Sequence, residues 1–462
     1  MTPVEKIVSV LVSLVIGLLV LSMPLAKVAL VVISIVMLTA VILRPRLGLY
    51  GFAFFSAFLP YSTVTLGVRI TISEALLLLI WFAVLLDTLA PSLNWSFSAT
   101  QKAVIALGVF SVIPFIWGQI YVEAPGNGVV SWFRWLMNIS TVLLVTLLIT
   151  SYSQLYSLIG CIVAGAVCMV LISTGYFVQG FDARNFAPFL EMVRYGNAEA
   201  YMDNFSSFNN RMGSPWVHPN LLGGMLALLL PVIYGWWLSN RTSSLRYVLL
   251  IASVIIMLGL LLSVSRGAML SIFLVLIWLT FQRTPHAKRM LMAALAIGVL
   301  AALFYPPIHE RIFTSVNTLS ESDGLRIAEY KAFPDAMMAY PLGIGFKSDP
   351  PPPGTELLGI SNLWLNYVYK IGIVGMLLFL LAIRNWWREV APSGYSQNET
   401  GSFFLHQGVV AGILAALLTG FVDHYYSFTN VLCGIFWMLV GISLLTAKFL
   451  HAEQASATDV KE

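Results

Sequence analysis

The feature that most constrains this chain is a succession of apolar runs, each close to the length that crosses a bilayer. A transmembrane helix needs about 20 predominantly apolar residues. Apolar residues make up 59% of the 462 residues, and charged residues make up 10%. Soluble domains carry about 25% charged residues. We therefore expect an all-α, polytopic integral membrane protein with about 12–14 transmembrane helices.

The candidate spans, taken in order, number about fourteen by their apolar length. They are 7–21, 26–43, 49–66, 72–89, 103–121, 132–149, 155–177, 221–238, 247–262, 268–281, 290–305, 363–383, 404–422 and 431–450. The first run has no clear small-residue cleavage site, so we interpret it as a retained anchor helix. The three cysteines lie in apolar runs without metal-ligand spacing, which favours buried hydrophobic side chains.

The short loops set the expected orientation. With the N-terminus in the cytoplasm, almost every short loop on that side carries Lys or Arg, for example Arg44-Pro45-Arg46. Cytoplasmic loops are enriched in these residues. The two long segments, 178–220 and 306–362, then lie outside. We expect both termini to be cytoplasmic.

Three regions follow from this division. Residues 1–178 form N-terminal transmembrane helices, and residues 179–447 form a core that includes both long outer loops. Residues 448–462 are expected to be a short cytoplasmic tail. The positive charges are scattered singly, which does not indicate a nucleic-acid partner.

Arg266 is the most informative residue of this core. It lies between two apolar runs in Ser263-Val264-Ser265-Arg266-Gly267. A charge at mid-membrane costs about 2.5–3.5 kcal/mol on insertion scales, so such residues usually face a cavity and serve a function. The alternative is an arginine that snorkels to the interface at a helix end. The expected topology puts Arg266 on the same side as both long loops.

The first long loop ends in Arg211, Gly213 and His218, followed by Pro219 and Asn220. Pro219 suits the first turn of a helix and Asn220 is a plausible N-cap. Arg211 and His218 would then lie beside a helix N-terminus, which favours anions. A polar capping segment with an incidental arginine is the alternative.

The second loop contains Arg326, Glu329, Tyr330 and Phe333 at helical spacing, which predicts a short amphipathic helix over the membrane. The following Pro341-x-Gly343-x-Gly345 stretch predicts a tight turn toward the core. Arg326 could instead form an ordinary ion pair with Glu329 or Asp323.

Further charged residues occur near the same side. Lys370 lies about two turns into a span, and Arg134 lies near another span end. Asp423-His424 forms the hairpin before the last span, where Asp423 could orient His424 as a general base. A chance pair in an exposed hairpin is an equally open interpretation.

Several cations gathered at a membrane surface suit a lipid that carries a diphosphate, because guanidinium groups bind phosphate oxygens bidentately. The chain contains no P-loop, dinucleotide fingerprint, zinc-protease motif or nucleophile elbow. Any chemistry outside must therefore use a substrate that arrives already activated.

Four pieces of the chain carry a resemblance to the O-antigen ligase and polymerase superfamily. They are Arg211-x-Gly213 before Pro219-Asn220, Ser263-x-Ser265-Arg266-Gly267, Arg326 with Pro341-x-Gly343-x-Gly345, and Asn362 heading a span with Gly372 and Gly375. The resemblance implies a membrane glycosyltransferase without metal or other cofactor. Its donor would be an undecaprenyl-diphosphate-linked oligosaccharide and its acceptor another glycan. The resemblance also implies a bacterial inner membrane, with the active site facing the periplasm or the cell exterior.

Within this resemblance, Arg211 and Arg266 bind the diphosphate, and we add Arg326, Lys370 and Arg134 as candidates. Ligases of the family usually carry a histidine just before the asparagine that starts the span after the long loop. That position is Ser361 here. We therefore expect a polymerase of O-antigen or exopolysaccharide units, with His424, Glu329 or His218 as the catalytic base.

Alternatives remain open at this point. A ligase would move the glycan to lipid A-core or another acceptor. A small-solute or ion transporter is the alternative of another class, but the chain shows no inverted repeat and no acidic pair at mid-membrane. A non-catalytic partner of an envelope polysaccharide assembly complex is a third.

Overall fold

The computed structural model is almost entirely helical. It describes residues 25–66, 68–88, 96–124, 126, 128–178, 187–195, 211–213, 216, 218–240, 244–304, 306, 309, 321–347, 359–392, 401–428 and 430–459. The predicted first span, 7–21, lies outside these residues. So do the end of the predicted tail and most of the first long loop.

Within the described residues, nine helical segments are long and apolar enough to cross a membrane. They are Ala99–Tyr121, Gly128–Leu148, Tyr152–Val178, Pro219–Ser239, Leu245–Ser263, Ala287–Phe304, Leu363–Val390, Gly401–Thr419 and Val431–Ala455. Three shorter apolar helical segments are Ser34–Leu43, Ile72–Leu86 and Arg266–Phe281. The expected all-α, polytopic membrane fold is thus confirmed.

The N-terminal helices are α2 (Leu25–Leu43), α3 (Pro45–Phe58) and α4 (Ile72–Thr88), with the hairpin β1 (Thr63–Leu66) and β2 (Val68–Thr71) before α4. The hairpin pairs Thr63 with Thr71 and Leu66 with Val68. The predicted span 49–66 is therefore wrong in its second half. Pro60 cannot continue a helix, and the β-branched residues after it favour a strand.

The next helices are α5 (Ala99–Phe110), α6 (Val112–Tyr121), α7 (Gly128–Ile139), α8 (Thr141–Leu148), α9 (Tyr152–Val178) and the short α10 (Ala187–Met192). The predicted spans 103–121 and 132–149 each contain a break, at Ser111 and Ser140. Pro114 explains the first break, because its ring conflicts with the carbonyl four residues earlier. Each pair of helices still forms one apolar segment.

The C-terminal helices are α12 (Pro219–Ser239), α13 (Leu245–Ser263), α14 (Arg266–Phe281), α15 (Ala287–Phe304), α17 (Glu321–Ala339), α18 (Leu363–Val390), α19 (Gly401–Thr419) and α20 (Asn430–Asp459). The bulk of the core lies in α12, α19 and α20, whose residues are mostly buried. Gly235 of α12 lies against Gly408 of α19, where a Cβ would stand 2.7 Å from the opposite Cα. Small residues of this kind let membrane helices approach closely.

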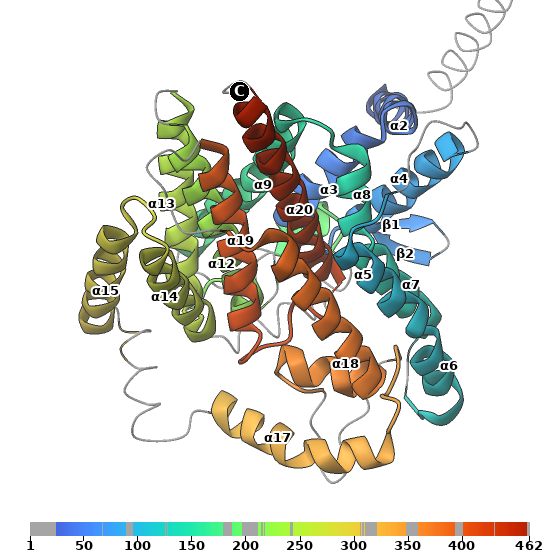
Figure 1. Cartoon of the computed structure of the whole chain (residues 1–462). Coiled ribbons are helices and arrows are strands. Elements are labelled where there is room, and N and C mark those ends of the chain that lie inside the picture. The colour runs from blue at the N-terminus through green and yellow to red at the C-terminus, as the bar shows by residue number, and fades with distance from the viewer. Residues whose placement is uncertain are drawn as a thin grey trace, which may run out of the picture.

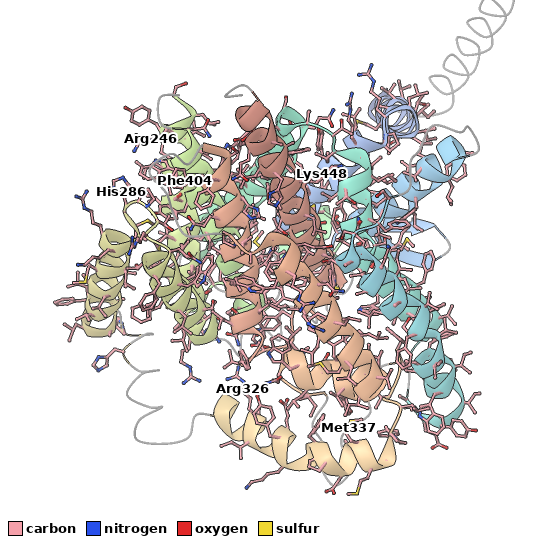
Figure 2. All side chains as sticks on the ribbon, in the orientation of Figure 1. Arg246, His286, Arg326, Met337, Phe404 and Lys448 are labelled. Atoms are coloured by element: carbon pink, nitrogen blue, oxygen red, sulfur yellow. The ribbon has the colours of Figure 1, made fainter. Side chains whose placement is uncertain are left out.

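Helix α17 lies across one end of the bundle, and the C-terminus lies at the other (Figure 1). We call these the α17 end and the opposite end. Arg326 lies at the α17 end, whereas Arg246 lies at the opposite end (Figure 2). Helix α17 confirms the predicted helix over residues 326–333 and extends it on both sides. Helix α20 continues to Asp459, so most of the predicted tail is helical.

Candidate functional site

The turn between α13 and α14 carries Arg266. Helix α13 ends at Ser263, and Val264 follows in the left-handed region with φ 50°. A β-branched residue in this region is uncommon and strained, and such strain clusters at functional sites. Arg211 holds the turn: its Nε donates to the carbonyl of Ser263 at 3.0 Å, and its Nη2 donates to that of Val264 at 3.4 Å.

Arg266 is the first residue of α14, with Ser265 as the N-cap. The N-terminus of a helix carries a partial positive charge, so a cation there raises the local positive potential. A partly exposed arginine and a helix N-terminus therefore favour the same kind of ligand, an anion. The predicted location of Arg266 between two apolar helices is confirmed by the helix bounds.

Helix α12 begins beside this turn. Its N-cap is His218, whose Nδ1 accepts a hydrogen bond from the backbone N–H of Asn220 at 3.1 Å. The expectation that Asn220 caps the helix is therefore wrong. Its side chain turns elsewhere: Oδ1 accepts from Nη2 of Arg211 at 2.5 Å, and Nδ2 donates to Asp423 at 3.4 Å. Asn220 thus links Arg211 to the loop between α19 and α20.

Asp423 is the centre of a polar cluster in that loop. Its side chain is buried, and Oδ2 lies 3.5 Å from Nη2 of Arg326 on α17. The hydroxyl of Tyr425 donates to the same oxygen. Burial raises the pKa of Asp423 to about 7, and the hydrogen bond from Tyr425 and the charge of Arg326 oppose that rise. The partner of Arg326 is thus a residue nearly a hundred positions away.

His424 follows Asp423 and is more exposed. Its Nδ1 lies 3.9 Å from Oδ1 of Asp423, beyond hydrogen-bond distance, and has no hydrogen-bond partner among the described residues. Burial, with the positive charges of Lys370 and Arg326, lowers the pKa of His424 to about 4. The imidazole is therefore neutral at pH 7, which is the form that accepts a proton.

Ser361 and Asn362 join α17 to the start of α18. Glu329 of α17 accepts hydrogen bonds from the backbone N–H of Ser361 at 2.7 Å and from its hydroxyl at 3.1 Å. Burial raises the pKa of Glu329. Asn362 is the N-cap of α18 and donates through Nδ2 to the carbonyl of Phe421 at 2.9 Å. Helix α18 therefore begins beside the Asp423 loop.

Helix α18 is broken two turns from its start, at Ile371 and Gly372. The break frees the carbonyls of Tyr369 and Lys370, which accept from the backbone N–H groups of Ile344 at 2.8 Å and Gly345 at 2.9 Å. Gly372 has φ 71°, a conformation that glycine adopts without a steric penalty. The predicted turn at 341–345 thus exists, and it fills the gap in a membrane helix.

This arrangement gathers most of the predicted site residues. Asp423 contacts Arg326 and Asn220, Asn220 contacts Arg211, and Lys370 lies close enough to affect His424. The starts of α12, α14 and α18 meet at the loop that carries Asp423. Gly267 of α14 contributes to this meeting, because a Cβ there would collide with the side chain of Val422.

Arg134 is held differently. Its Nε lies 3.2 Å from Oε1 of Glu74, an ion pair between α7 and α4. The pair fixes Arg134 in the N-terminal half of the fold. The neighbouring Trp135 donates to the carbonyl of Ser427 at 3.1 Å, so α7 still contacts the loop of the polar cluster.

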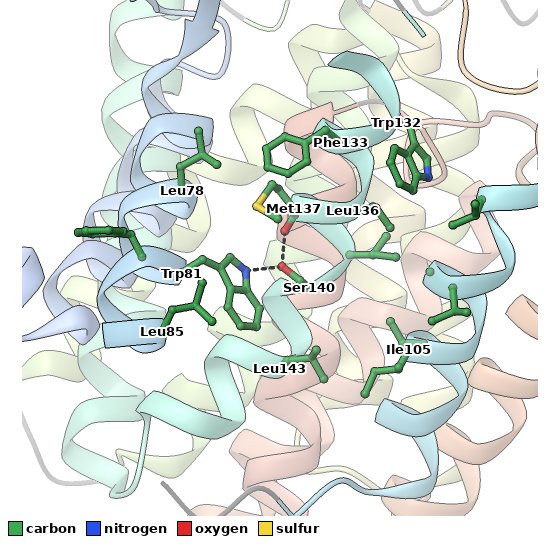
Figure 3. Close-up of a pocket in the computed structure, with 16 residues that line it drawn as sticks. Leu78, Trp81, Leu85, Ile105, Trp132, Phe133, Leu136, Met137, Ser140 and Leu143 are labelled. Carbon is green, nitrogen blue, oxygen red and sulfur yellow. Dashed lines mark hydrogen bonds between the residues drawn. The ribbon is translucent and has the colours of Figure 1, made fainter. Parts of the chain in front are cut away.

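An apolar groove of about 690 Å³ lies beside this ion pair, between α4, α5 and α7. Figure 3 shows Leu78, Trp81 and Ile105 on its walls. The hydroxyl of Ser140, which lines the groove, accepts a hydrogen bond from Nε1 of Trp81 at 2.8 Å and donates one to the carbonyl of Met137 at 2.7 Å (Figure 3). With this hydroxyl already engaged, the groove suits hydrocarbon and offers little for catalysis.

Residues 251–380 match the family model described as O-antigen ligase. The match confirms the resemblance to the O-antigen ligase and polymerase superfamily. It supports a membrane enzyme of the ligase or polymerase type. The matched segment runs from α13 into α18 and includes Arg266, Arg326 and Glu329, whereas Arg211 and Asp423 lie outside it. No curated protein matches the chain.

Two features of the cluster were not predicted. The sequence suggests Asp423 as the partner of His424 and does not reveal its contact with Arg326. The sequence suggests Asn220 as a helix cap and does not reveal that it bridges Arg211 and Asp423. An isolated acidic residue between two apolar helices was the available signal, because buried carboxylates are rarely without a partner.

Proposed function

We propose that this protein is a membrane glycosyltransferase that polymerises undecaprenyl-diphosphate-linked oligosaccharides. The observation that carries the proposal is the meeting of cations and helix N-termini at the α17 end. Arg211, Arg266, Arg326 and Lys370 lie in or beside that region. Positive side chains and helix starts together favour a polyanionic group such as a diphosphate.

In the proposed reaction, a hydroxyl of the acceptor glycan attacks the anomeric carbon of the donor sugar. The bond from that carbon to the phosphate oxygen breaks, and the lipid diphosphate leaves with the electron pair. The arginines stabilise the negative charge that develops on it. The proton of the hydroxyl passes to a base, for which we favour His424, with Asp423 to orient it.

Glu329 and His218 are weaker candidates for the base. Both oxygens of Glu329 accept hydrogen bonds from Ser361. Nδ1 of His218 accepts from the start of α12. Each group therefore has a structural partner on the atoms that a base would use, whereas Nδ1 of His424 has no hydrogen-bond partner among the described residues.

The preference for a polymerase rests on Ser361. Ligases of the family usually carry a histidine at this position, and the serine here is bound to Glu329 and lacks a group that is basic at neutral pH. We further propose that the α17 end faces the periplasm or cell exterior in the bacterial inner membrane, where the lipid-linked glycan would be available.

The decisive experiment uses purified protein in nanodiscs with a synthetic undecaprenyl-diphosphate oligosaccharide. Arg266→Ala should lower the rate by about 100-fold or more, the typical cost of removing one stabilising group from a developing anion. Arg289→Ala, which removes an exposed arginine from the first turn of α15, should not.

Lengthening of the glycan from the lipid donor alone supports a polymerase. Transfer that requires a separate lipid A-core acceptor would identify a ligase instead. Wild-type activity in Arg266→Ala would contradict the proposed role of the diphosphate site.

A further inference from the structure

A second apolar groove, of about 470 Å³, lies between α13, α14 and α15. Its walls include Met257, Leu260 and Leu261 from α13, and Met269, Leu270 and Phe273 from α14. The groove differs from the one in Figure 3 in what lies at its end. Its residues Leu261 and Met269 flank the turn that carries Arg266.

The spacing along α14 places Arg266 at the end of this groove that is nearer to α17. The groove residues Met269, Leu270 and Phe273 follow Arg266 by three, four and seven positions. All four residues therefore share one face of the helix. Side chains of a helix also lean toward its N-terminus. The side chain of Arg266 therefore extends from the groove wall toward the α17 end, where the polar cluster lies.

The third wall, α15, is loosely attached. Ala287 is its one buried residue, and most of its large apolar side chains are exposed. It stands at the edge of the bundle, beside α14 (Figure 1). Gly298 lines the groove, and a Cβ at this position would meet no atom within 4 Å. The groove is thus bordered by a helix that makes few packing contacts with the rest of the fold.

We propose that this groove seats the polyprenyl chain of the donor while Arg266 binds its diphosphate. The inference rests on the proposed function. The apolar walls match the hydrocarbon chain, and the cation at the end of the same helix face matches the anionic head. Near the groove between α4, α5 and α7, the carboxylate of Glu74 forms an ion pair with Arg134. That groove therefore has less to offer an anionic head.

The test fills the groove without touching Arg266. Gly298→Trp places an indole in the open space, and Gly175→Trp is the matched control. Gly175 also has no atom within 4 Å of a Cβ, but it lies on α9. Binding of radiolabelled undecaprenyl diphosphate and of isopentenyl diphosphate, which shares the head but has a single isoprene unit, is measured on each protein in nanodiscs.

Gly298→Trp should weaken binding of undecaprenyl diphosphate about tenfold or more, because each methylene removed from apolar contact lowers affinity. Binding of isopentenyl diphosphate should stay unchanged, and Gly175→Trp should affect neither. Arg266→Ala should weaken both. Thermal unfolding of each variant checks that the fold is intact.

The outcomes separate the two proposals. If Arg266→Ala weakens both ligands and Gly298→Trp weakens neither, the groove inference is overturned and the diphosphate site stands. If wild-type protein binds neither ligand, both fail. If Gly298→Trp releases co-purified phospholipid but leaves undecaprenyl diphosphate binding unchanged, the groove is an ordinary lipid site and the inference is wrong.

Discussion

Asp423 connects the elements of the α17 end at the scale of single residues. Its carboxylate contacts Arg326 from α17, Asn220 from α12 and Tyr425 from its own loop. A buried charge is tolerated when it is paired and hydrogen-bonded, and removing its partners is costly. Asp423 therefore holds Arg326 and Asn220 in place, and through Asn220 it also orients Arg211.

Asp423→Asn tests this role. We expect activity to fall by about 100-fold or more, because the amide loses both the ion pair and the proposed orientation of His424. In the wild type, the rate should fall as the pH decreases through about 7, since protonation of Asp423 removes the charge that attracts Arg326. The variant should lack this step. The measurement is the initial rate of glycan transfer against pH.

Asp335→Asn is the control for that experiment, because Asp335 is an exposed carboxylate on α17. It should keep the rate and the pH profile of the wild type. An unchanged step near pH 7 in Asp423→Asn would show that another group titrates there, and Asp423 would then have no part in it.

At the scale of elements, the broken helix α18 explains the glycine motif in the second loop. A break in a membrane helix exposes backbone groups that need partners, and here the 343–345 turn supplies them. Gly343 has φ 85°, and a Cβ on it would lie 2.5 Å from the carbonyl oxygen of Lys370. The turn and the break therefore depend on each other.

Gly343→Ala should destabilise the protein by about 1–3 kcal/mol, because alanine is strained at this φ and would displace the turn from α18. Gly324→Ala is the matched change, on α17, where a Cβ would meet nothing within 4 Å. It should be neutral or stabilise by up to about 1 kcal/mol. Thermal unfolding in detergent measures both. Equal unfolding temperatures for the two variants would contradict the dependence of the turn on Gly343.

At the scale of the whole molecule, the direction of the helices gives the protein two unlike ends. Helices α12, α14 and α18 start at the α17 end, which carries the polar cluster. The opposite end carries basic residues such as Arg246, whose guanidinium lies 4.4 Å from the ring of Trp237. Cytoplasmic loops are rich in Lys and Arg. This asymmetry underlies the proposed orientation, with the α17 end outside.

Cysteine labelling tests the orientation. Lys331 on α17 and Lys288 at the start of α15 are both exposed. In a variant without the native cysteines, Lys331→Cys should react with an impermeant maleimide added to cells with a permeabilised outer membrane. Lys288→Cys should react only after the inner membrane is lysed. The reverse pattern would place the polar cluster in the cytoplasm and contradict the proposed function.

Much of the fold could be predicted because membrane spans are local. Apolar length and composition located the long apolar helices that the structure describes, and failed where local signals competed, as at Pro60 and Pro114. Helix α17 was predicted from residues at helical spacing, and the short α10 was not predicted. The charged residues of the candidate site could also be identified one by one from the sequence, because a cation in an apolar region is costly wherever it lies.

By itself, the sequence determined that the chain is helical, that it spans a membrane and that Arg266 lies between two apolar runs. The tertiary structure decided the partners. Asn220 and Asp423 are 203 residues apart in sequence, and only the packing of α12 against α19 brings them together. Hydrophobicity belongs to each segment, whereas an ion pair depends on two segments meeting. For that reason the contact between Arg326 and Asp423 could be seen only in the folded protein.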